Sequence, residues 1–177
     1  PEDMEQVASR LGFPLVLKIP DGCFSRGVIK VHDARQLQEA SSELFEHSVL
    51  LLAQEFLYTE YDWRIGILNG QPLYACRYYM APEHWQIIKR DTSGKQEGEA
   101  DTLPIDAVPT RVLEVAMKAA KTVGDGLYGV DLKQFGNRVA LIEVNDNPNV
   151  DAGSRTWFLA ASIPSVRPAA TLPARRR

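Results

Sequence analysis

The chain has 177 residues, of which 45% are hydrophobic and 24% are charged, and its formal net charge is −3. A chain of this size and composition can bury a core without a structural metal ion or disulfide bonds. Its two cysteines, Cys23 and Cys76, form no CxxC motif. This excludes a disulfide framework and a zinc ribbon, and it favours the reducing environment of the cytoplasm. No apolar run is long enough to cross a membrane, so we expect no membrane partner.

The charged residues divide the chain into two parts of different composition. All 23 acidic residues lie at or before Asp151, and every charged residue after it is an arginine. The net-acidic body of the chain argues against nucleic acid as a partner. The composition of residues 154–177, rich in Ala, Pro and Arg, predicts a disordered tail.

Two helices and two strands are predicted in the first part of the chain. A capping-box pattern predicts a helix over residues 3–11, and apolar runs predict strands over residues 14–19 and 28–31. The strands are separated by residues 21–27, where two glycines among small polar residues predict a mobile loop. Asp33 starts a second predicted helix, whose inner face is formed by Leu37, Ala40 and Leu44.

The second part of the chain is predicted to contain mainly strands. Residues 49–58 predict a mostly buried strand, and residues 80–107 are polar and predicted to be irregular. The dipeptides Asn69-Gly70 and Gly136-Asn137 predict hairpins. The strands of these hairpins are predicted over residues 63–68 and 73–79, and over residues 127–133 and 138–145.

One more helix is predicted between the two hairpins. Pro109 suits its first turn. Its inner face is predicted to contain Val112, Val115, Ala116, Ala119 and Val123. The order of the elements indicates an α+β fold with antiparallel or mixed sheets, and the sequence has no βαβ fingerprint of dinucleotide binding.

Three oxygen-bearing side chains are predicted to meet on one face of the last hairpin. Glu143 and Asn145 are two residues apart on a strand and therefore share a face. The Gly136-Asn137 turn brings Asp131 opposite or nearly opposite Glu143. Two carboxylates and an amide suit Mg²⁺ or Mn²⁺, with phosphate oxygens and water as further ligands. The alternative interpretation is a solvated strand face.

Lys18 and the segment Gln54–Leu57 are candidates for nucleotide binding. Lys18 ends a strand before a glycine-containing loop, where it could meet phosphates, although a lysine at a strand end usually reaches into water. The backbone of Gln54, Glu55, Phe56 and Leu57 could read an adenine edge. The alternative for this segment is an ordinary core strand.

Cations on and after the first hairpin are candidates for stabilising a transferred phosphoryl group. Arg64 and Arg77 lie on the hairpin, and Lys89 and Arg90 follow it. Single arginines on a hairpin are more often simply solvated. The three histidines have no ligand spacing, so no catalytic role is assigned to them.

Taken together, these segments resemble the ATP-grasp fold and, within it, the RimK-like carboxylate–amine ligases. The resemblance runs from about Leu11 to Gly153. LGFPLVLKIPDG is similar to the nucleotide-binding lysine strand and lid, AQEFL to the hinge strand, and DWR follows the hinge. GVDLK followed by IEVNDNPN is similar to the metal-binding core of the family and is the most specific of these motifs.

The resemblance implies an ATP-dependent ligase that forms an amide or peptide bond through an acyl phosphate. ATP and Mg²⁺ or Mn²⁺ are the implied cofactors, and a small-molecule or peptide carboxylate and an amine are the implied substrates, with glutamate a common choice in such relatives. The implied metal ligands are Asp131, Glu143 and Asn145. The implied nucleotide contacts are Lys18, Gly22, Ser25, Gly27, Gln54, Glu55, Phe56, Leu57 and Asp62. Arg77, Lys89 and Arg90 are implied at the acyl phosphate.

The resemblance also predicts a domain organisation. Residues 1–57 correspond to the central lid subdomain, residues 58–153 to the subdomain with the metal site, and residues 154–177 to an atypical tail. The N-terminal lobe of the family is expected to be missing, so we expect an incomplete ligase that self-associates as a homo-oligomer. The alternative function is a nucleotide-binding module without ligase turnover, which would bind Mg·ATP but show no amine-dependent release of ADP.

Overall fold

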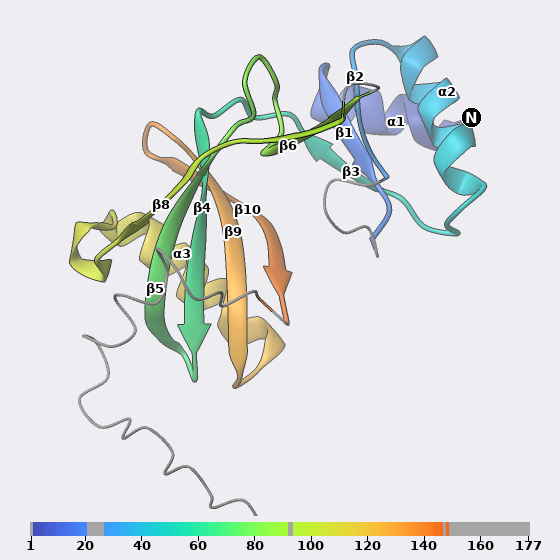
Figure 1. Cartoon of the computed structure of the whole chain (residues 1–177). Coiled ribbons are helices and arrows are strands. Elements are labelled where there is room, and N and C mark those ends of the chain that lie inside the picture. Colours follow the sequence, from blue (N-terminus) through green and yellow to red (C-terminus); the bar gives the residue numbers. More distant parts are fainter. Residues whose placement is uncertain (1, 21–26, 92–93, 147, 149–177) are drawn as a thin grey trace, which may run out of the picture. The chain divides into compact units, whose positions relative to one another are not determined.

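The computed structural model describes residues 2–20, 27–91, 94–146 and 148 (Figure 1). Its first elements are α1 (Glu2–Leu11), β1 (Leu15–Lys18), β2 (Val28–Val31), α2 (Ala34–Phe45), β3 (Leu52–Glu55), β4 (Tyr61–Leu68) and β5 (Gln71–Tyr79). The following elements are β6 (Ile88–Asp91), β7 (Gly94–Glu97), β8 (Ala100–Leu103), the 3-10 helix η1 (Ile105–Ala107), α3 (Thr110–Val123), β9 (Leu127–Phe135) and β10 (Arg138–Asn145). The strands pair as antiparallel neighbours, which confirms the predicted α+β class. The predicted loop, apart from Gly27, and the predicted tail lie outside the described residues.

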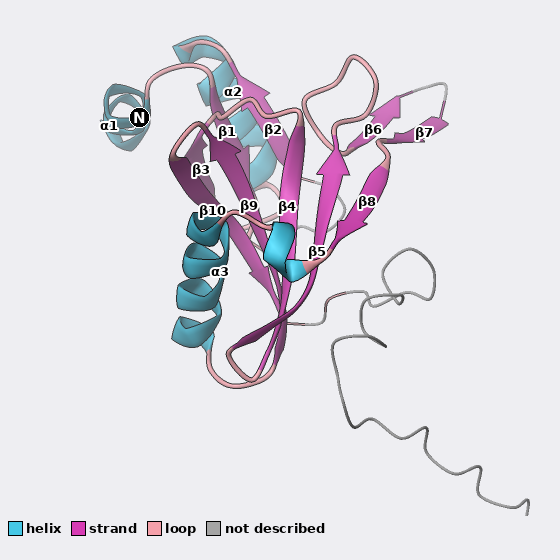
Figure 2. Cartoon of the chain, turned by 90° about the vertical axis from the view of Figure 1, so that its left-hand side faces the viewer, coloured by secondary structure: helices cyan, strands magenta, loops and turns pink. Residues whose placement is uncertain are grey.

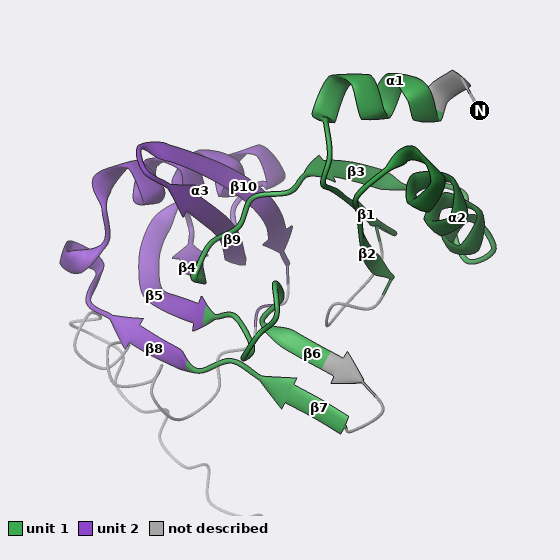
Figure 3. Ribbon diagram, turned by 90° about the horizontal axis from the view of Figure 1, so that it is seen from above, with its two compact units in different colours: residues 1–61, 79–99 green, residues 62–78, 100–177 purple. Residues whose placement is uncertain are grey.

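The chain divides into two compact units (Figure 3). Unit 1 contains residues 1–61 and 79–99, and unit 2 contains residues 62–78 and 100–177. Residues 79–99 therefore belong to unit 1, whereas the sequence analysis predicted a single boundary between the two subdomains after residue 57. Each unit has a sheet of its own, in the order β2-β1-β3 in unit 1 and β10-β9-β4-β5-β8 in unit 2.

The core of unit 1 lies between its sheet and α2, with α1 packed at its edge. Leu15 and Leu17 of β1 point to this side and are at most 2% exposed. The predicted inner face of α2 is confirmed, because Leu37, Ala40 and Leu44 are buried in the same cluster. Burial of each such leucine stabilises the fold by about 1.5–3 kcal/mol. The predicted start of α2 is confirmed too, since Asp33 Oδ1 accepts a hydrogen bond from the Gln36 amide at 2.8 Å.

The strand predicted over residues 49–58 is shorter and more exposed than its apolar sequence suggests. β3 covers Leu52–Glu55 alone, and Val49, Leu50 and Tyr58 are exposed. β3 pairs with β1 at the edge of the sheet. Leu51 packs against the core of unit 1, but Val49, Leu50 and Tyr58 stay exposed, so the prediction of a mostly buried strand was wrong.

Both predicted hairpins of unit 2 are present. Asn69 and Gly70 have φ angles of 49° and 74°, the left-handed pair that a tight two-residue hairpin turn requires. Gly136 has a φ of 56° at the turn between β9 and β10. α3 packs along β9 and β10 (Figure 2). Its buried residues are Val112, Ala116, Ala119 and Ala120, whereas Val123, predicted on the inner face, is 54% exposed.

Residues 80–107 contain short strands that the sequence did not predict. β8 extends the sheet of unit 2 by pairing with β5, and β6 pairs with β7 in unit 1. All the residues of β7 are exposed, so no alternation of apolar and polar residues marked it as a strand. The prediction of an irregular segment was therefore wrong for these elements.

Candidate functional site

One face of the sheet in unit 2 carries four charged side chains on two neighbouring strands. β4 contributes Asp62 and Arg64, and β9 contributes Asp131 and Lys133. We call these four residues the charged face. The residues that alternate with them are buried and apolar, and they are Trp63, Ile65, Val130 and Leu132. Because successive side chains of a strand point to opposite faces, one face of these strands packs as core and the other presents charges.

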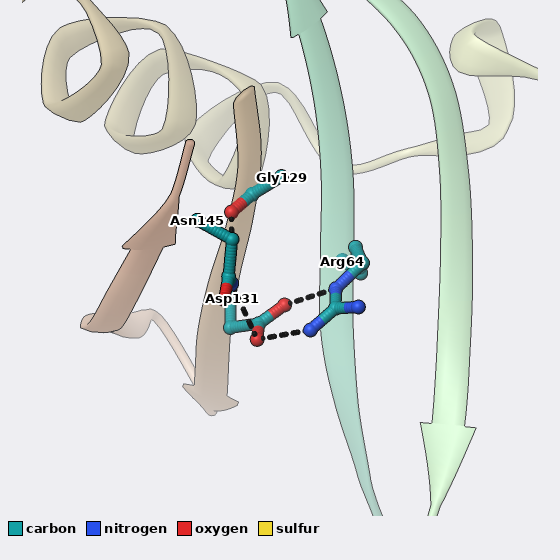
Figure 4. A network of polar contacts seen from close by, with 4 residues as sticks. All are labelled: Arg64, Gly129, Asp131 and Asn145. Atoms are coloured by element: carbon teal, nitrogen blue, oxygen red, sulfur yellow. Dashed lines mark hydrogen bonds and ion pairs between the residues drawn. The ribbon is translucent and has the colours of Figure 1, made fainter. Parts of the chain in front are cut away.

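Arg64 holds Asp131 in a two-point ion pair (Figure 4). Nε of Arg64 donates to Oδ1 of Asp131 and Nη2 donates to Oδ2, both at 2.6 Å. The two side chains are 21% and 16% exposed, and the guanidinium lies 5.2 Å from the centre of the Tyr78 ring. Burial lowers the pKa of Arg64, but the hydrogen bonds and charge of Asp131 outweigh this and raise that pKa above its ordinary value. Arg64 is therefore always charged in this setting.

Asn145 joins the same network from β10. Its amide nitrogen donates to the Gly129 carbonyl and to Oδ2 of Asp131, both at 3.2 Å (Figure 4). Both hydrogen bonds use the nitrogen, so the amide oxygen takes no part in them. Asn145 and Asp131 therefore lie on the same face of the sheet, as the sequence predicted.

Glu143 reaches this face because of a β-bulge in β10. Leu141 pairs with Leu132 and Glu143 pairs with Asp131, so two steps along β10 correspond to one step along β9. Without the extra residue Glu143 would pair with Val130 and point to the apolar face, since a slip of one residue reverses every side chain. The bulge thus makes Glu143 the direct cross-strand partner of Asp131.

The donor set on this face fits a hard divalent cation. Two carboxylates and an amide oxygen are the ligands that Mg²⁺ and Mn²⁺ prefer. Within the described ranges no three His, Cys, Asp or Glu side chains gather closely enough to hold a metal. A cation here would therefore use Asp131, Glu143 and the Asn145 oxygen, together with ligands from outside the protein.

Asp62, which the resemblance implies as a nucleotide contact, is paired with Lys133 on the charged face. Nζ of Lys133 lies 2.5 Å from Oδ1 of Asp62, and the two side chains are 14% and 15% exposed. The charged face thus contains two cross-strand ion pairs side by side, Arg64 with Asp131 and Lys133 with Asp62. Sequence reasoning named Arg64 as a candidate and missed Lys133, although the alternating charges of DWR and DLK were visible in both motifs.

Arg77 is not brought together with Asp131. It forms its own ion pair with Asp101 of β8, with Nε at 3.0 Å from Oδ1. Its neighbour Tyr78 contacts Arg64 on the charged face. Because side chains alternate along β5, Arg77 points to the opposite face of the sheet.

Two candidate nucleotide residues of unit 1, Lys18 and Gln54, lie on the sheet face opposite its core. Lys18 ends β1, and Lys30 of β2 and Gln54 of β3 are the cross-strand partners of Val16. Lys18, Lys30 and Gln54 therefore share one face with Val16. Lys30, which sequence reasoning missed, places its ammonium 4.5 Å from the centre of the Phe56 ring.

Phe56 belongs to an aromatic cluster in unit 1. Its ring meets Trp85 edge to face with centroids 5.7 Å apart, and the Lys30 ammonium lies 5.3 Å from the Trp85 ring centre. These three residues line part of a pocket of about 620 Å³ whose wall also includes Tyr58 and Tyr79. Phe56 therefore lines this pocket, where it contacts Trp85 and Lys30.

The remaining predicted site residues are only partly described. Gly27 has a φ of 66°, and a Cβ there would lie 2.7 Å from Cγ1 of Ile19, so the position needs glycine. Gly22 and Ser25 lie outside the described residues, as does the side chain of Arg90. Lys89 lies half-buried in β6, Leu57 is half-buried, and Glu55 is exposed at the end of β3.

The chain matches a known family and several curated proteins. A model described as D-ala D-ala ligase C-terminus matches residues 1–161. A probable alpha-L-glutamate ligase of Shewanella halifaxensis is 25% identical over 142 residues, which are 79% of this chain and 29% of that protein. A D-alanine–D-alanine ligase of Actinobacillus pleuropneumoniae is 27% identical over 163 residues, which are 91% of this chain and 53% of that protein. The chain thus spans about half or less of the length of these relatives.

Solved structures share the fold. A D-alanine–D-alanine ligase from Bacillus anthracis has a TM-score of 0.63 and 21% identity, over 81% of this chain and 47% of that one. The ATP-grasp ligase PsnB, in complex with the precursor peptide PsnA2 and AMPPNP, has a TM-score of 0.59 and 20% identity over 85% of this chain and 43% of that one. These likenesses confirm the predicted ATP-grasp fold.

Among the described helices, none is long and apolar enough to cross a membrane. Because the family model covers most of the sequence, this chain belongs to the D-ala D-ala ligase C-terminus family.

Proposed function

We propose that this chain is the ATP- and metal-binding part of a ligase that joins a carboxylate to an amine at the expense of ATP. The observation that carries the proposal is the arrangement of Asp131, Glu143 and Asn145 on one face of the β9–β10 hairpin. Membership of the ligase family and relatives named as ligases support the same reaction class.

The residues of unit 2 would hold the metal in this proposal. Asp131, Glu143 and the amide oxygen of Asn145 would bind Mg²⁺ or Mn²⁺, leaving positions for phosphate oxygens and water. The bound ion would supply positive charge to the phosphates of ATP. The amide nitrogen of Asn145 donates to the Gly129 carbonyl and to Oδ2 of Asp131, so the amide oxygen is the atom that would bind the ion.

The residues of unit 1 would bind the nucleotide. Lys18 would meet the phosphates as a point charge, and the backbone of Glu55–Leu57 would contact adenine, with Phe56 as an apolar wall. Lys89 would add a cation at the phosphates. Phosphoryl transfer depends mainly on positioning and charge neutralisation, and these residues supply both. Arg77 is given no substrate contact, because its ion pair with Asp101 lies on the other face of the sheet.

The substrates are the finer part of the proposal. We propose an acidic amino acid, glutamate, as the carboxylate or amine substrate, because the Shewanella relative is named a probable alpha-L-glutamate ligase. D-alanine is the competing substrate, since other relatives are named D-alanine–D-alanine ligases. The chain can be incubated with ATP, Mg²⁺ and either glutamate or D-alanine, and the release of ADP measured. The amino acid that stimulates ADP release is the substrate. A protein that only binds nucleotide would release ADP with neither.

The first experiment measures ATP binding by calorimetry with and without Mg²⁺ for the wild type, Asp131→Asn and Asp101→Asn. We expect Asp131→Asn to lose the Mg²⁺-dependent part of the affinity and to keep the metal-independent part. Asp101→Asn is the matched control, because it breaks the same kind of ion pair on the opposite face. If both variants fold, as verified by circular dichroism, and lose the same share of the Mg²⁺-dependent ATP affinity, the proposed metal site is contradicted.

A further inference from the structure

Asp131 accepts three hydrogen bonds from protein donors. Arg64 binds both of its carboxylate oxygens, and the Asn145 amide adds a third hydrogen bond to Oδ2. A divalent cation bound to these oxygens would lie close to the positively charged guanidinium, whose nitrogens are 2.6 Å from the same oxygens. Metal binding at Asp131 is therefore opposed by the Arg64 pair and favoured when the pair opens.

If Arg64 leaves Asp131, the acid of its own strand is already paired. Asp62, the acid two residues before it on the same face, is paired with Lys133. A guanidinium that is 21% exposed is poorly placed to be solvated instead. Its planar fork suits two oxygens of a phosphate as well as it suits a carboxylate.

We infer that Arg64 is an exchangeable counter-ion, which neutralises Asp131 while the metal is absent and passes to a phosphate group when metal and nucleotide bind together. This inference rests on the proposed function. It makes Arg64 a positioning residue for Asp131 in one state and an anion ligand in the other. It also predicts cooperativity, because the nucleotide offers Arg64 a new partner when the metal competes with Arg64 for Asp131.

The cooperativity is reciprocal by thermodynamic linkage. If the triphosphate raises the affinity for the metal, the metal raises the affinity for the triphosphate by the same factor, which for coupled sites is about 5- to 150-fold. Removal of Arg64 should abolish this contribution in both directions. If the ion pair were merely structural, the removal of Arg64 would instead lower the stability of the fold and leave the affinity for metal alone unchanged.

The test is Mn²⁺ binding followed by the electron paramagnetic resonance signal of the unbound ion, with and without AMPPNP. We expect Arg64→Gln to bind Mn²⁺ alone at least tenfold more tightly than the wild type. We also expect AMPPNP to raise the Mn²⁺ affinity of this variant much less than it raises that of the wild type. Arg64→Lys keeps the charge without the fork and should fall between the two.

Lys133→Gln is the matched control. It removes one positive charge from the same face, but that charge is paired with Asp62 rather than with Asp131. An equal gain in Mn²⁺ affinity for Lys133→Gln and Arg64→Gln would show a general charge effect and overturn the exchange. Mn²⁺ affinity in Arg64→Gln equal to that of the wild type would overturn it as well.

Two further outcomes separate this inference from the proposed function. If the wild type bound Mn²⁺ neither alone nor with AMPPNP, the proposed metal site would fail and the exchange with it. If Mn²⁺ bound with AMPPNP and was lost in Asp131→Asn, the metal site would stand, and the Arg64 variants alone would decide the exchange. Should Arg64→Gln fail to fold, tighter binding of Mn²⁺ by Arg64→Lys supports the exchange, and unchanged binding overturns it.

Discussion

Two arginine–aspartate pairs on the sheet of unit 2 have the same local geometry and different surroundings. Arg64 with Asp131 and Arg77 with Asp101 are both direct cross-strand partners joined through Nε and Nη2. The carboxylate of Asp131 is 16% exposed, however, and that of Asp101 is 41% exposed. Asn145 also donates to Asp131.

The comparison shows that an ion pair does not by itself mark a functional site. What distinguishes Asp131 is the neighbouring hairpin strand, whose bulge places Glu143 beside it and whose end supplies Asn145. Asp101 lies on β8, opposite Arg77. The same pair therefore serves as a surface contact in one place and as part of a candidate metal site in the other.

The largest expected difference between the two pairs is in stability. Asp131→Asn should lower the free energy of unfolding by about 3 kcal/mol, because it leaves the Arg64 charge buried without its partner. Asp101→Asn should cost less than about 1 kcal/mol, as is usual for an exposed pair. Urea unfolding without metal measures both. Similar losses for the two variants would mean that burial does not distinguish the pairs.

A smaller effect is expected from the ring beside Arg64. Tyr78→Leu removes the aromatic face that lies 5.2 Å from the guanidinium. The lost cation–π contact should appear as a coupling of about 0.5–1 kcal/mol between Tyr78 and Arg64. A double-mutant cycle with Arg64→Gln, read out by urea unfolding, isolates it. A coupling of zero would show that the ring packs there without stabilising the charge.

The smallest expected effect is the response to salt. Screening over about 10 Å at 0.1 M ionic strength weakens exposed pairs more than half-buried ones. Raising NaCl from low to high concentration should therefore remove most of the coupling between Arg77 and Asp101 and leave most of that between Arg64 and Asp131. Double-mutant cycles at both salt concentrations measure this. The reverse order would contradict the assigned difference in burial.

Local patterns in the sequence were enough to predict much of the fold. Asn69-Gly70 and Gly136-Asn137 fix tight turns by their own backbone preferences, and Asp33 caps α2 through a neighbour three residues away. The prediction failed where burial depends on a distant partner. Apolar residues from Val49 to Tyr58 suggested a core strand, but nothing in their sequence shows that β3 would lie at a sheet edge.

The candidate site was predictable in part for the same reason. The two-residue periodicity of a strand placed Glu143 and Asn145 on one face, and the short turn brought Asp131 near them. No residue type in β10 indicates the bulge that sets the final register. The Arg64 pair joins residues 67 apart in sequence, and strand pairing over that distance depends on the whole fold.

The central claim is that Asp131 and Glu143 bind a divalent metal together with nucleotide. The most direct measurement is the carboxyl ¹³C chemical shift of the aspartates and glutamates during a Mg²⁺ titration in the presence of AMPPNP. We expect the signals of Asp131 and Glu143 to move together along one binding curve, while the signal of Asp101 stays in place. Saturable Mg²⁺ binding that leaves the Asp131 signal unchanged would contradict the claim.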